Sequence, residues 1–344
     1  MTGKETIKRT VDFKNLGCIP FNIGVSPQFV REKDPVKWDR IKQLQEESPN
    51  PIFERSNTRF SKDENKDGIR YCTDQWGTQW QDKGTGMFTT YHPMEEGYEH
   101  IDRVCFPDVN NTDVFHNAKT AFAARTDNYI LGDVWFTLFE RLWMLRGFTN
   151  MLIDPYTEEG NFLKLKERIM QVNMASIDKW LELDVDGIYF SDDWGTQQNL
   201  LINPDEWRRL YKNDYRRMFE KVRNAGKNVW MHLCGNITAI LPDLIDIGLN
   251  VLNPVQPQAM DLAYLSRQFR GHVCFYGGID VQGVMVNGTP EEVRAAVHKT
   301  IDLLSTPQGG YICSTSHSIM PETPLDNIIA LLETITDYKY RGKK

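Results

Sequence analysis

The sequence lacks the segments that would place it in a membrane or outside the cell. Its most apolar long stretch, residues 129–153, is interrupted by Asp133, Glu140, Arg141 and Arg146, so it is not a membrane span. The first ten residues contain no apolar run of the kind that a secretory signal requires. Six cysteines in 344 residues do not form a disulfide framework. We therefore expect a cytoplasmic protein with reduced thiols and no membrane partner.

The chain also lacks a basic excess and the glycine-rich loops that bind phosphate. A net charge of −7 argues against general nucleic-acid binding. No G-x-G-x-x-G follows an early strand and no Walker-type loop is present, which counts against a nucleotide-binding fold. Hydrophobic content of 40% and charged content of 25% are ordinary for a globular protein, and the length allows one large α/β domain or two.

From about residue 111, short apolar runs alternate with amphipathic helical segments. We expect strands that begin near residues 129, 187, 229, 250, 273 and 311, each followed by a helix. Helix-capping signals such as N-P-D-E at 203–206 and T-P-E-E at 289–292 support this reading. Repeated β-α units predict an α/β fold, here a (β/α)8 TIM barrel over residues 111–344. Residues 1–110 are irregular, and we predict an N-terminal extension that covers the barrel and shapes the substrate pocket.

One stretch, Asn228–Asn236, joins a short apolar run to two metal-binding side chains. His232 and Cys234 are two residues apart at the expected strand end, so they face the same way in an extended chain. Imidazole nitrogen and thiolate sulfur are ligands that Zn2+ prefers, and Cys313 supplies a second thiol at another strand end. Three ligands would leave one position open, as in a catalytic zinc site. The alternative is that these cysteines are small buried hydrophobes.

Polar residues recur just after the expected strands, where barrel enzymes build their active sites. Aromatic residues, among them Trp76, Trp80 and Trp135, would either line the pocket or pack in the core, and for Trp76 and Trp80 packing is the favoured interpretation. The polar candidates are Asp133, Asp192, Asp193, His232, Cys234, Asn253, Asp280, Cys313 and His317.

Several runs resemble the uroporphyrinogen decarboxylase superfamily. They are F-S-D-D-W-G-T-Q at 190–197, M-H-L-C-G-N-I at 231–237, F-Y-G-G-I-D at 275–280 and C-S-T-S-H-S-I-M-P-E-T-P-L-D-N-I at 313–328. Within the superfamily they are most similar to the branch of zinc-dependent, corrinoid-linked methyltransferases. The resemblance covers roughly residues 111–340 and is weak in the first hundred. It implies a (β/α)8 barrel with its site at the carboxyl ends of the strands.

The resemblance also implies roles for individual residues. His232, Cys234 and Cys313 match the zinc ligands of the methyltransferase branch in type and order. Some members that cleave methyl ethers use an acid with two cysteines, so an aspartate in place of His232 stays open. Asp192, Asp193 and His317 are the expected catalytic residues, although His317 would equally serve as a structural hydrogen-bond partner. The expected substrate pocket comprises Trp76, Asp133, Trp194, Asn253, Tyr276 and Asp280.

The function that follows from the resemblance is methyl transfer, including O-demethylation. A methyl group would move between a small molecule (a methyl ether, a methoxylated aromatic or a thiol) and the cobalt of a corrinoid (cobalamin) carried by a partner protein. A homodimer is one candidate assembly. The first alternative is a metal-independent decarboxylase of a porphyrinogen-like substrate, although residues 17–25 lack the arginine cluster that would bind its carboxylates. The second is a non-catalytic binding protein on an enzyme fold.

Overall fold

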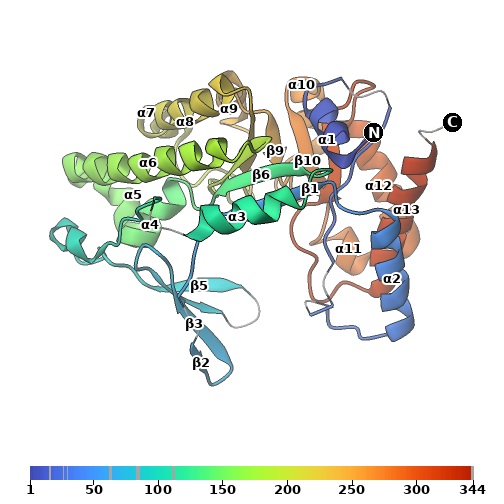
Figure 1. Cartoon of the computed structure of the whole chain (residues 1–344), viewed down its shortest axis with the longest axis horizontal. Coiled ribbons are helices and arrows are strands. Elements are labelled where there is room, and N and C mark those ends of the chain that lie inside the picture. Colours follow the sequence, from blue (N-terminus) through green and yellow to red (C-terminus); the bar gives the residue numbers. More distant parts are fainter. Residues whose placement is uncertain are drawn as a thin grey trace.

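A seven-stranded, fully parallel sheet forms the centre of the molecule (Figure 1). The computed structural model describes residues 1–14, 17–25, 27–28, 30–61, 64–82, 86–110 and 113–341. Six of the seven strands begin within one residue of the predicted starts, which confirms the α/β fold. In sheet order the strands are β1 (Ile52–Ser56), β6 (Tyr129–Val134), β7 (Gly187–Ser191), β8 (Asn228–His232), β9 (Val251–Asn253), β10 (Cys274–Ile279) and β11 (Tyr311–Thr315).

Helices follow the strands and cover the outer face of the sheet. The predicted caps form as expected: Asn203 accepts the Asp205 N–H, and Thr289 and Glu292 make a reciprocal capping box. No helix in the described part of the chain is long and apolar enough to span a membrane. The helices are α1 (Gly3–Val11), α2 (Pro35–Glu47), α3 (Asp113–Ala123), α4 (Phe139–Arg146), α5 (Phe148–Thr157), α6 (Glu159–Glu182), α7 (Pro204–Leu210), α8 (Lys212–Asn224), α9 (Leu241–Asp246), α10 (Leu262–Phe269), α11 (Val284–Asn287), α12 (Pro290–Leu304) and α13 (Leu325–Arg341).

The eighth position of the barrel is taken by residues 20–22, which make only one bridge. Phe21 pairs in parallel with Cys313, whose N–H donates to Pro20 O at 2.9 Å. On the other side, the Ile23 N–H donates to Asn50 Oδ1 at 2.9 Å, just before β1. The fold is therefore TIM-like, but a strand ladder that closes the barrel is not present among the described residues.

One barrel strand comes from the segment that the sequence analysis assigned to the N-terminal extension. β1 pairs in parallel with β6, so the predicted boundary at residue 110 does not separate the sheet from the extension. A five-residue strand is too short to produce a diagnostic periodicity. The rest of this region includes the 3-10 helix η1 (Tyr98–Arg103) and an antiparallel sheet of β2 (Glu64–Lys66), β3 (Ile69–Thr73), β4 (Gln79–Asp82) and β5 (Met87–Tyr91).

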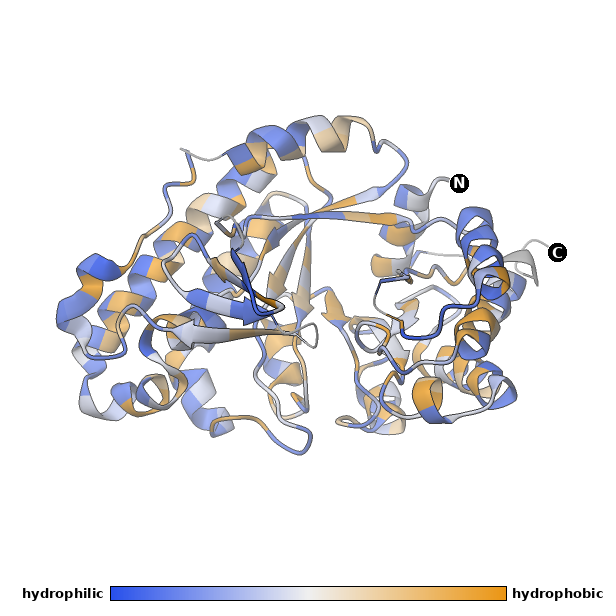
Figure 2. Ribbon diagram, turned by 90° about the horizontal axis from the view of Figure 1, so that it is seen from below, coloured by the Kyte–Doolittle hydropathy of each residue, from blue (hydrophilic) through white to orange (hydrophobic). Residues whose placement is uncertain are grey.

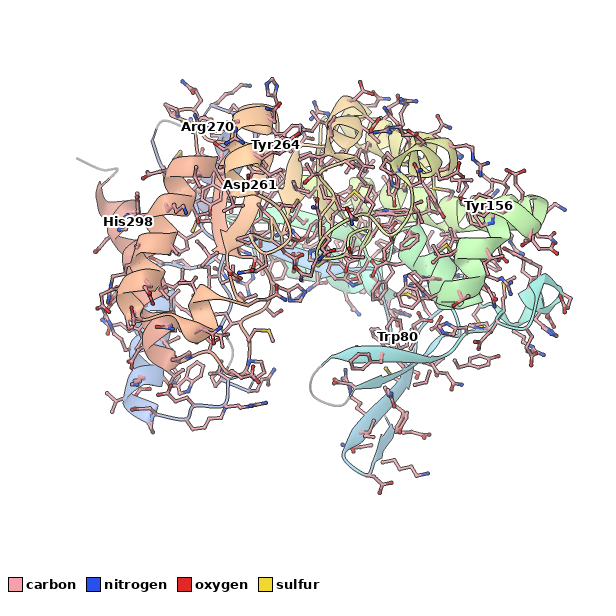
Figure 3. The ribbon with its side chains drawn as sticks, turned by 180° about the vertical axis from the view of Figure 1, so that it is seen from behind. Trp80, Tyr156, Asp261, Tyr264, Arg270 and His298 are labelled. Carbon is pink, nitrogen blue, oxygen red and sulfur yellow. The ribbon has the colours of Figure 1, made fainter. Side chains whose placement is uncertain are left out.

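This antiparallel sheet projects from one edge of the molecule (Figure 1). The hairpin predicted around residues 74–77 joins β3 to β4. Trp80 lies where the sheet meets the main body and stacks on Phe136, with ring centroids 5.4 Å apart (Figure 3). Both Trp76 and Trp80 are buried, as the packing interpretation predicts.

Side chains alternate along the barrel strands between two apolar clusters. In β8, Val229 and Met231 join the outer cluster beneath the helices, whereas Trp230 joins the inner cluster. Figure 2 shows apolar and polar residues alternating around the helices, with many apolar positions turned toward the sheet. Ile7 and Val11 of α1 complete the inner cluster, so α1 covers the amino ends of the strands.

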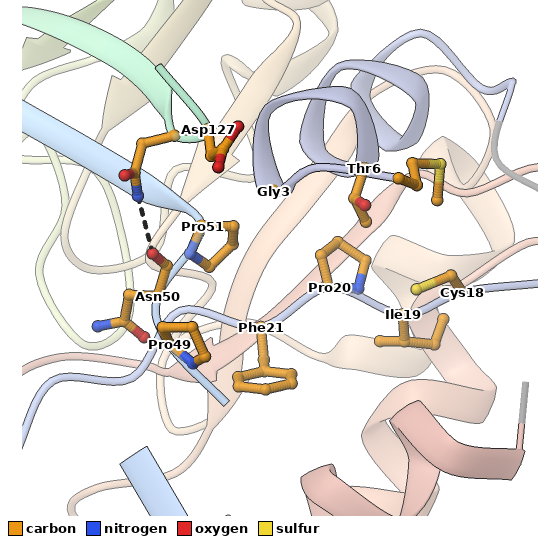
Figure 4. A pocket seen from close by; sticks show the side chains of 12 residues that line it. Gly3, Thr6, Cys18, Ile19, Pro20, Phe21, Pro49, Asn50, Pro51 and Asp127 are labelled. Atoms are coloured by element: carbon orange, nitrogen blue, oxygen red, sulfur yellow. Dashed lines mark hydrogen bonds between the residues drawn. The ribbon is translucent and has the colours of Figure 1, made fainter. Parts of the chain in front are cut away.

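A cavity of about 260 Å³ lies at this covered end, between α1 and residues 18–21 (Figure 4). Gly3 and Pro51 form part of its wall. Cys18 and Asp127 are the titratable side chains in the lining, and they belong to no group of potential metal ligands among the described residues. In this fold the active site is expected at the opposite end of the barrel, at the carboxyl ends of the strands.

Candidate metal centre and adjoining cavity

His232, Cys234 and His317 come together at the carboxyl ends of β8 and β11. Their donor atoms all lie within 4.8 Å of one another, the one group of this kind among the described residues. His232 Nε2 is 3.2 Å from Cys234 Sγ. Two ligands on one tetrahedral Zn2+, with bonds of about 2.05 Å to nitrogen and about 2.3 Å to sulfur, lie about 3.5 Å apart. The donor set and the spacing both fit Zn2+.

The orientation of His232 is set by a buried amide. Asn253 Oδ1 accepts hydrogen bonds from the Tyr189 hydroxyl at 2.5 Å and from His232 Nδ1 at 2.7 Å. The amide cannot turn over, because its Nδ2 donates to Tyr276 O at 3.1 Å. An oxygen acceptor at Nδ1 requires the proton there, so the lone pair of His232 is on Nε2 and faces Cys234. This is the tautomer that a metal at Nε2 needs.

Two glycines hold the loops after β7 and β8 together, backbone to backbone. The Gly195 N–H donates to Cys234 O at 3.1 Å, and the Asn236 N–H donates to Thr196 O at 2.7 Å. Gly235 has φ +81°, and a Cβ there would overlap the backbone of Gly195. The thiol of Cys234 is therefore positioned by a loop contact that only small residues permit.

Asp193 approaches the group from the loop after β7. Its Oδ1 accepts the Cys234 N–H at 2.8 Å and lies 3.8 Å from His232 Nε2. Burial raises the pKa of the Cys234 thiol, and the Asp193 carboxylate adds to that shift. His317 is exposed at the rim of the cavity; partial desolvation of its ring there lowers the pKa, with a contribution from His232, and favours the neutral imidazole that binds metals.

Cys313, predicted as the third metal ligand, lies elsewhere. It belongs to the outer cluster with Tyr311, whereas its neighbours Ile312 and Ser314 face the inner cluster and the cavity. Successive side chains on a strand point to opposite faces, so Cys313 cannot turn toward His232. Burial raises the pKa of its thiol to about 12, as for a packing residue. His317, rather than Cys313, lies beside His232 and Cys234.

Asp192, predicted as catalytic, is fully buried and caps α4. Burial raises the pKa of its carboxyl to about 6, and the hydrogen bonds that it accepts oppose this shift. Its hydrogen bonds satisfy the first free N–H groups of α4 and so fix where the helix begins. The donors are the N–H groups of Leu138 at 2.8 Å, Phe139 at 2.9 Å and Glu140 at 2.6 Å, and the hydroxyl of Tyr215.

A cavity of about 550 Å³ adjoins the metal-binding group. His232 and His317 form part of its wall, as do the predicted pocket residues Asn253 and Tyr276. Asp133, another predicted pocket residue, is buried on the inward face of β6, in register with Tyr189 of the cavity wall. Other lining residues include Asn22, Glu54 and Trp135, two of them from the first hundred residues.

The other predicted pocket residues lie away from the cavity. Trp76 is buried and packs on Phe106 with ring centroids 5.8 Å apart. Trp194 is buried against Phe139, with a centroid distance of 4.0 Å. Asp280 borders a separate cavity of about 350 Å³ between α10 and α12. The two tryptophans serve packing, which is the commoner role of large aromatic side chains.

Two carboxyl groups near the site were not singled out from the sequence. Glu54 is exposed and lines the cavity from β1; partial desolvation raises the pKa of its carboxyl, and His232 opposes this shift. Glu140 is buried beside Ser191, and burial together with Asp193 raises its pKa well above the usual range. Glu140 is one of three charged residues in the mainly apolar helix α4, which does not single it out in the sequence, and Glu54 had no sequence sign either.

Comparison with known protein families gives one match that covers more than half of the chain. Residues 136–338 match the family described as uroporphyrinogen decarboxylase (URO-D). This range includes β7 to β11 and the three residues of the metal-binding group.

Similar proteins carry two kinds of name. The methylcobamide:CoM methyltransferase MtbA of Methanosarcina mazei is 23% identical over 212 residues, 62% of this chain and 55% of that protein. The uroporphyrinogen decarboxylase of Thermus thermophilus is 23% identical over 195 residues, 56% of this chain and 53% of that protein. The chain therefore spans about half the length of the curated relatives that it matches.

Solved structures agree on the fold. A methyltransferase from Methanosarcina mazei superposes with a TM-score of 0.67 at 13% identity, covering 98% of this chain and 99% of that one. A B12-independent methionine synthase from Shewanella sp. W3-18-1 superposes with a TM-score of 0.52 at 12% identity, covering 95% and 98% of the two chains. At such identities the likeness shows the TIM-like fold alone.

Proposed function

This chain belongs to the uroporphyrinogen decarboxylase family, and from that premise we propose that it is a zinc-dependent methyltransferase. It moves a methyl group between a small molecule and the cobalt of a corrinoid protein. The observation that carries the proposal is the group of His232, Cys234 and His317 beside a cavity of about 550 Å³. The relatives named as methylcobamide:CoM methyltransferases support a corrinoid methyl carrier.

The residues around the group have distinct tasks in this proposal. When bound, Zn2+ supplies a Lewis acid with one open position for the heteroatom that bears or receives the methyl group. Asn253 keeps the His232 Nε2 lone pair on the metal side, and Asp193 orders the Cys234 backbone. The Trp135 ring, 5.7 Å from the His232 ring, covers one side of the site.

The charge of the cavity favours this proposal over a porphyrinogen decarboxylase. A tetrapyrrole with several carboxylates needs several cationic partners. The described residues that line the cavity include neither lysine nor arginine, and Glu54 adds a carboxyl group. The carboxylates of a porphyrinogen would therefore face an acidic cavity lining instead of cationic side chains.

The first test is the metal content of the purified chain and of matched variants. About one zinc per chain is expected in the native protein, lost in Cys234→Ser and His317→Ala because each removes a donor. Cys313→Ala is the matched control, a second cysteine removed from outside the group, and should keep its zinc. Zinc loss in Cys313→Ala alone would restore the ligand set predicted from the sequence. A folded native protein without zinc, prepared without chelator, would refute the proposed function.

The second test is methyl transfer itself. Free methylcobalamin with a candidate thiol, and reduced cobalamin with a candidate methyl ether, test the two directions through the visible spectrum of the corrinoid. Activity in either direction that disappears in Cys234→Ser and persists in Cys313→Ala is expected. Equal activity of native protein and Cys234→Ser would contradict the role of the metal group.

A further inference from the structure

One wall of the cavity carries hydrogen-bond acceptors that have no protein partner. Glu54 lines the cavity from β1, and its carboxyl group has no hydrogen bond or ion pair within the described chain. Asn22, from the segment that fills the eighth barrel position, also lines the cavity. Its Nδ2 donates to the Tyr276 hydroxyl at 2.7 Å, which leaves Oδ1 buried and unpaired. Both side chains therefore offer a free oxygen to a ligand.

Asp133 contributes a third acceptor and is much more buried. The residue is 4% exposed, and its Oδ1 has no hydrogen-bond partner. It alternates on β6 with Tyr129 and Leu131 of the inner cluster, so it faces the barrel interior. In register it lies opposite Tyr189, which lines the cavity. Its register partner on β1 is Ser56, two residues after Glu54 and on the same face as it, so the two acids lie on neighbouring strands and face the same side. Burial and the nearby Glu54 raise the pKa of the Asp133 carboxyl well above its usual range.

An unpaired buried acceptor is costly, about 1–3 kcal/mol for a group that water cannot reach. Native proteins leave few such groups, and a ligand donor is one way to satisfy them. Two of the three groups, Asn22 Oδ1 and Asp133 Oδ1, are buried acceptors without a partner, and Glu54 adds an exposed carboxyl group to the cavity lining. Neither lysine nor arginine is among the described lining residues. The missing partner is therefore a donor of hydrogen bonds with positive charge.

The remaining walls suit the same ligand. The rings of Trp135, Tyr189 and Tyr276 line the cavity. Glu54 is near enough to Tyr189 and Tyr276 to contribute to the raised pKa of both phenols. Aromatic faces attract cations by about 0.5–2 kcal/mol, more where water is excluded. A neutral methoxylated aromatic would fill these walls but would leave the acceptors unpaired.

We propose that the small molecule bound in this cavity is a protonated amine, whose ammonium group donates hydrogen bonds to Glu54, Asp133 and Asn22. The inference rests on the proposed function for the ligand's role as the methyl-transfer substrate. The binding itself requires neither zinc nor a corrinoid, so it is testable separately.

The experiment compares three probes that share one ring and one methoxy group and differ in charge. They are para-methoxybenzylamine, para-methoxybenzyl alcohol and para-methoxybenzoate, each titrated calorimetrically into the full chain at neutral pH. The ammonium probe is expected to bind at least about tenfold more tightly than the alcohol, and the benzoate more weakly than both. Equal affinity of the amine and the alcohol would overturn the proposal.

Variants assign the preference to the acidic wall. Glu54→Gln and Asp133→Asn keep the shape of the side chains and remove a carboxyl group that can ionise beside an ammonium ion, so each should reduce the amine affinity at least about fivefold while the alcohol affinity stays near native. Glu46→Gln, on the exposed face of α2, removes a carboxylate far from the cavity lining and should change neither. Circular dichroism confirms that each variant is folded. If one of the two acid variants fails to fold, the other one is used for the test. An unchanged ratio of amine affinity to alcohol affinity in that variant would overturn the proposal.

Zinc content measured on the same samples separates this inference from the proposed function. A chain that binds amines selectively but holds no zinc upholds amine binding and refutes the metal-dependent reaction. A chain that holds zinc and transfers methyl groups without preferring the amine overturns the present inference alone.

Discussion

Replacing Asn253 with alanine should weaken the metal centre without touching a metal ligand. Asn253 is 6% exposed, and its amide satisfies His232 Nδ1, the Tyr189 hydroxyl and the Tyr276 carbonyl at once. In Asn253→Ala the His232 ring loses the acceptor that holds its proton on Nδ1. The imidazole then turns more freely and takes up both tautomers, only one of which has its lone pair toward Cys234.

The size of the effect follows from these contacts. Loss of a hydrogen bond to the distal nitrogen of a metal-binding histidine typically lowers metal affinity about 10- to 100-fold, or about 1.4–2.7 kcal/mol. The free energy of unfolding falls as well, by about 1–3 kcal/mol for each polar group that loses its Asn253 partner and that water from the cavity cannot reach. Affinity and stability are therefore measured separately.

The assay is competition for zinc between the protein and a chromophoric chelator, alongside urea unfolding of the metal-free forms. Long-range proton–nitrogen NMR of the metal-free native chain should find the His232 proton on Nδ1. Asn224→Ala, at the exposed end of α8, is the matched control and should bind zinc with native affinity. Native zinc affinity in Asn253→Ala, or a proton on Nε2 of His232, would refute the reasoning.

Three further substitutions test how the site is supported. Arg141→Met removes the ion-pair partner of the buried Asp74 carboxylate, which lies 2.6 Å from the Arg141 guanidinium. The free energy of unfolding in urea should fall by about 3–5 kcal/mol. A fall of under about 1 kcal/mol would contradict this expectation. Gly235→Ala should lose both thermal stability and zinc, whereas Gly226→Ala, with positive φ but open space around it, should cost only about 1 kcal/mol and keep its zinc. Asp192→Ala should lower the free energy of unfolding by about 2–4 kcal/mol while zinc stays bound; zinc loss at native stability would instead support a role at the site.

The sequence predicted much of the fold because its signals are local. Strand starts from β6 to β11 were found within one residue, since each is a short apolar run between helix caps. β1 was not predicted, because five residues in an irregular region give no periodic pattern. Glu54 was not predicted for the same reason, because its place in the cavity lining depends on where β1 lies in the barrel.

The metal-binding group shows the same division. His232 and Cys234 were recognised because residues two apart in an extended chain point to the same side. The third donor was assigned to Cys313, four residues before His317, because a thiol matched the family pattern. Side-chain alternation turns Cys313 into the outer cluster, and only the path of the loop after β11 carries His317 back over the cavity.

By itself, then, the sequence determined the order of strands and helices, the TIM-like class and the pairing of His232 with Cys234 at the end of β8, because these depend on neighbouring residues. Tertiary structure alone brought His317 to His232 and Cys234, gave Asp192 its capping role, and placed Asn22 and Glu54 in one cavity lining with Asp133 on the neighbouring strand β6. Those outcomes depend on which face of each strand is turned inward and on which strands lie side by side. These are properties of the assembled barrel that no short stretch of sequence contains.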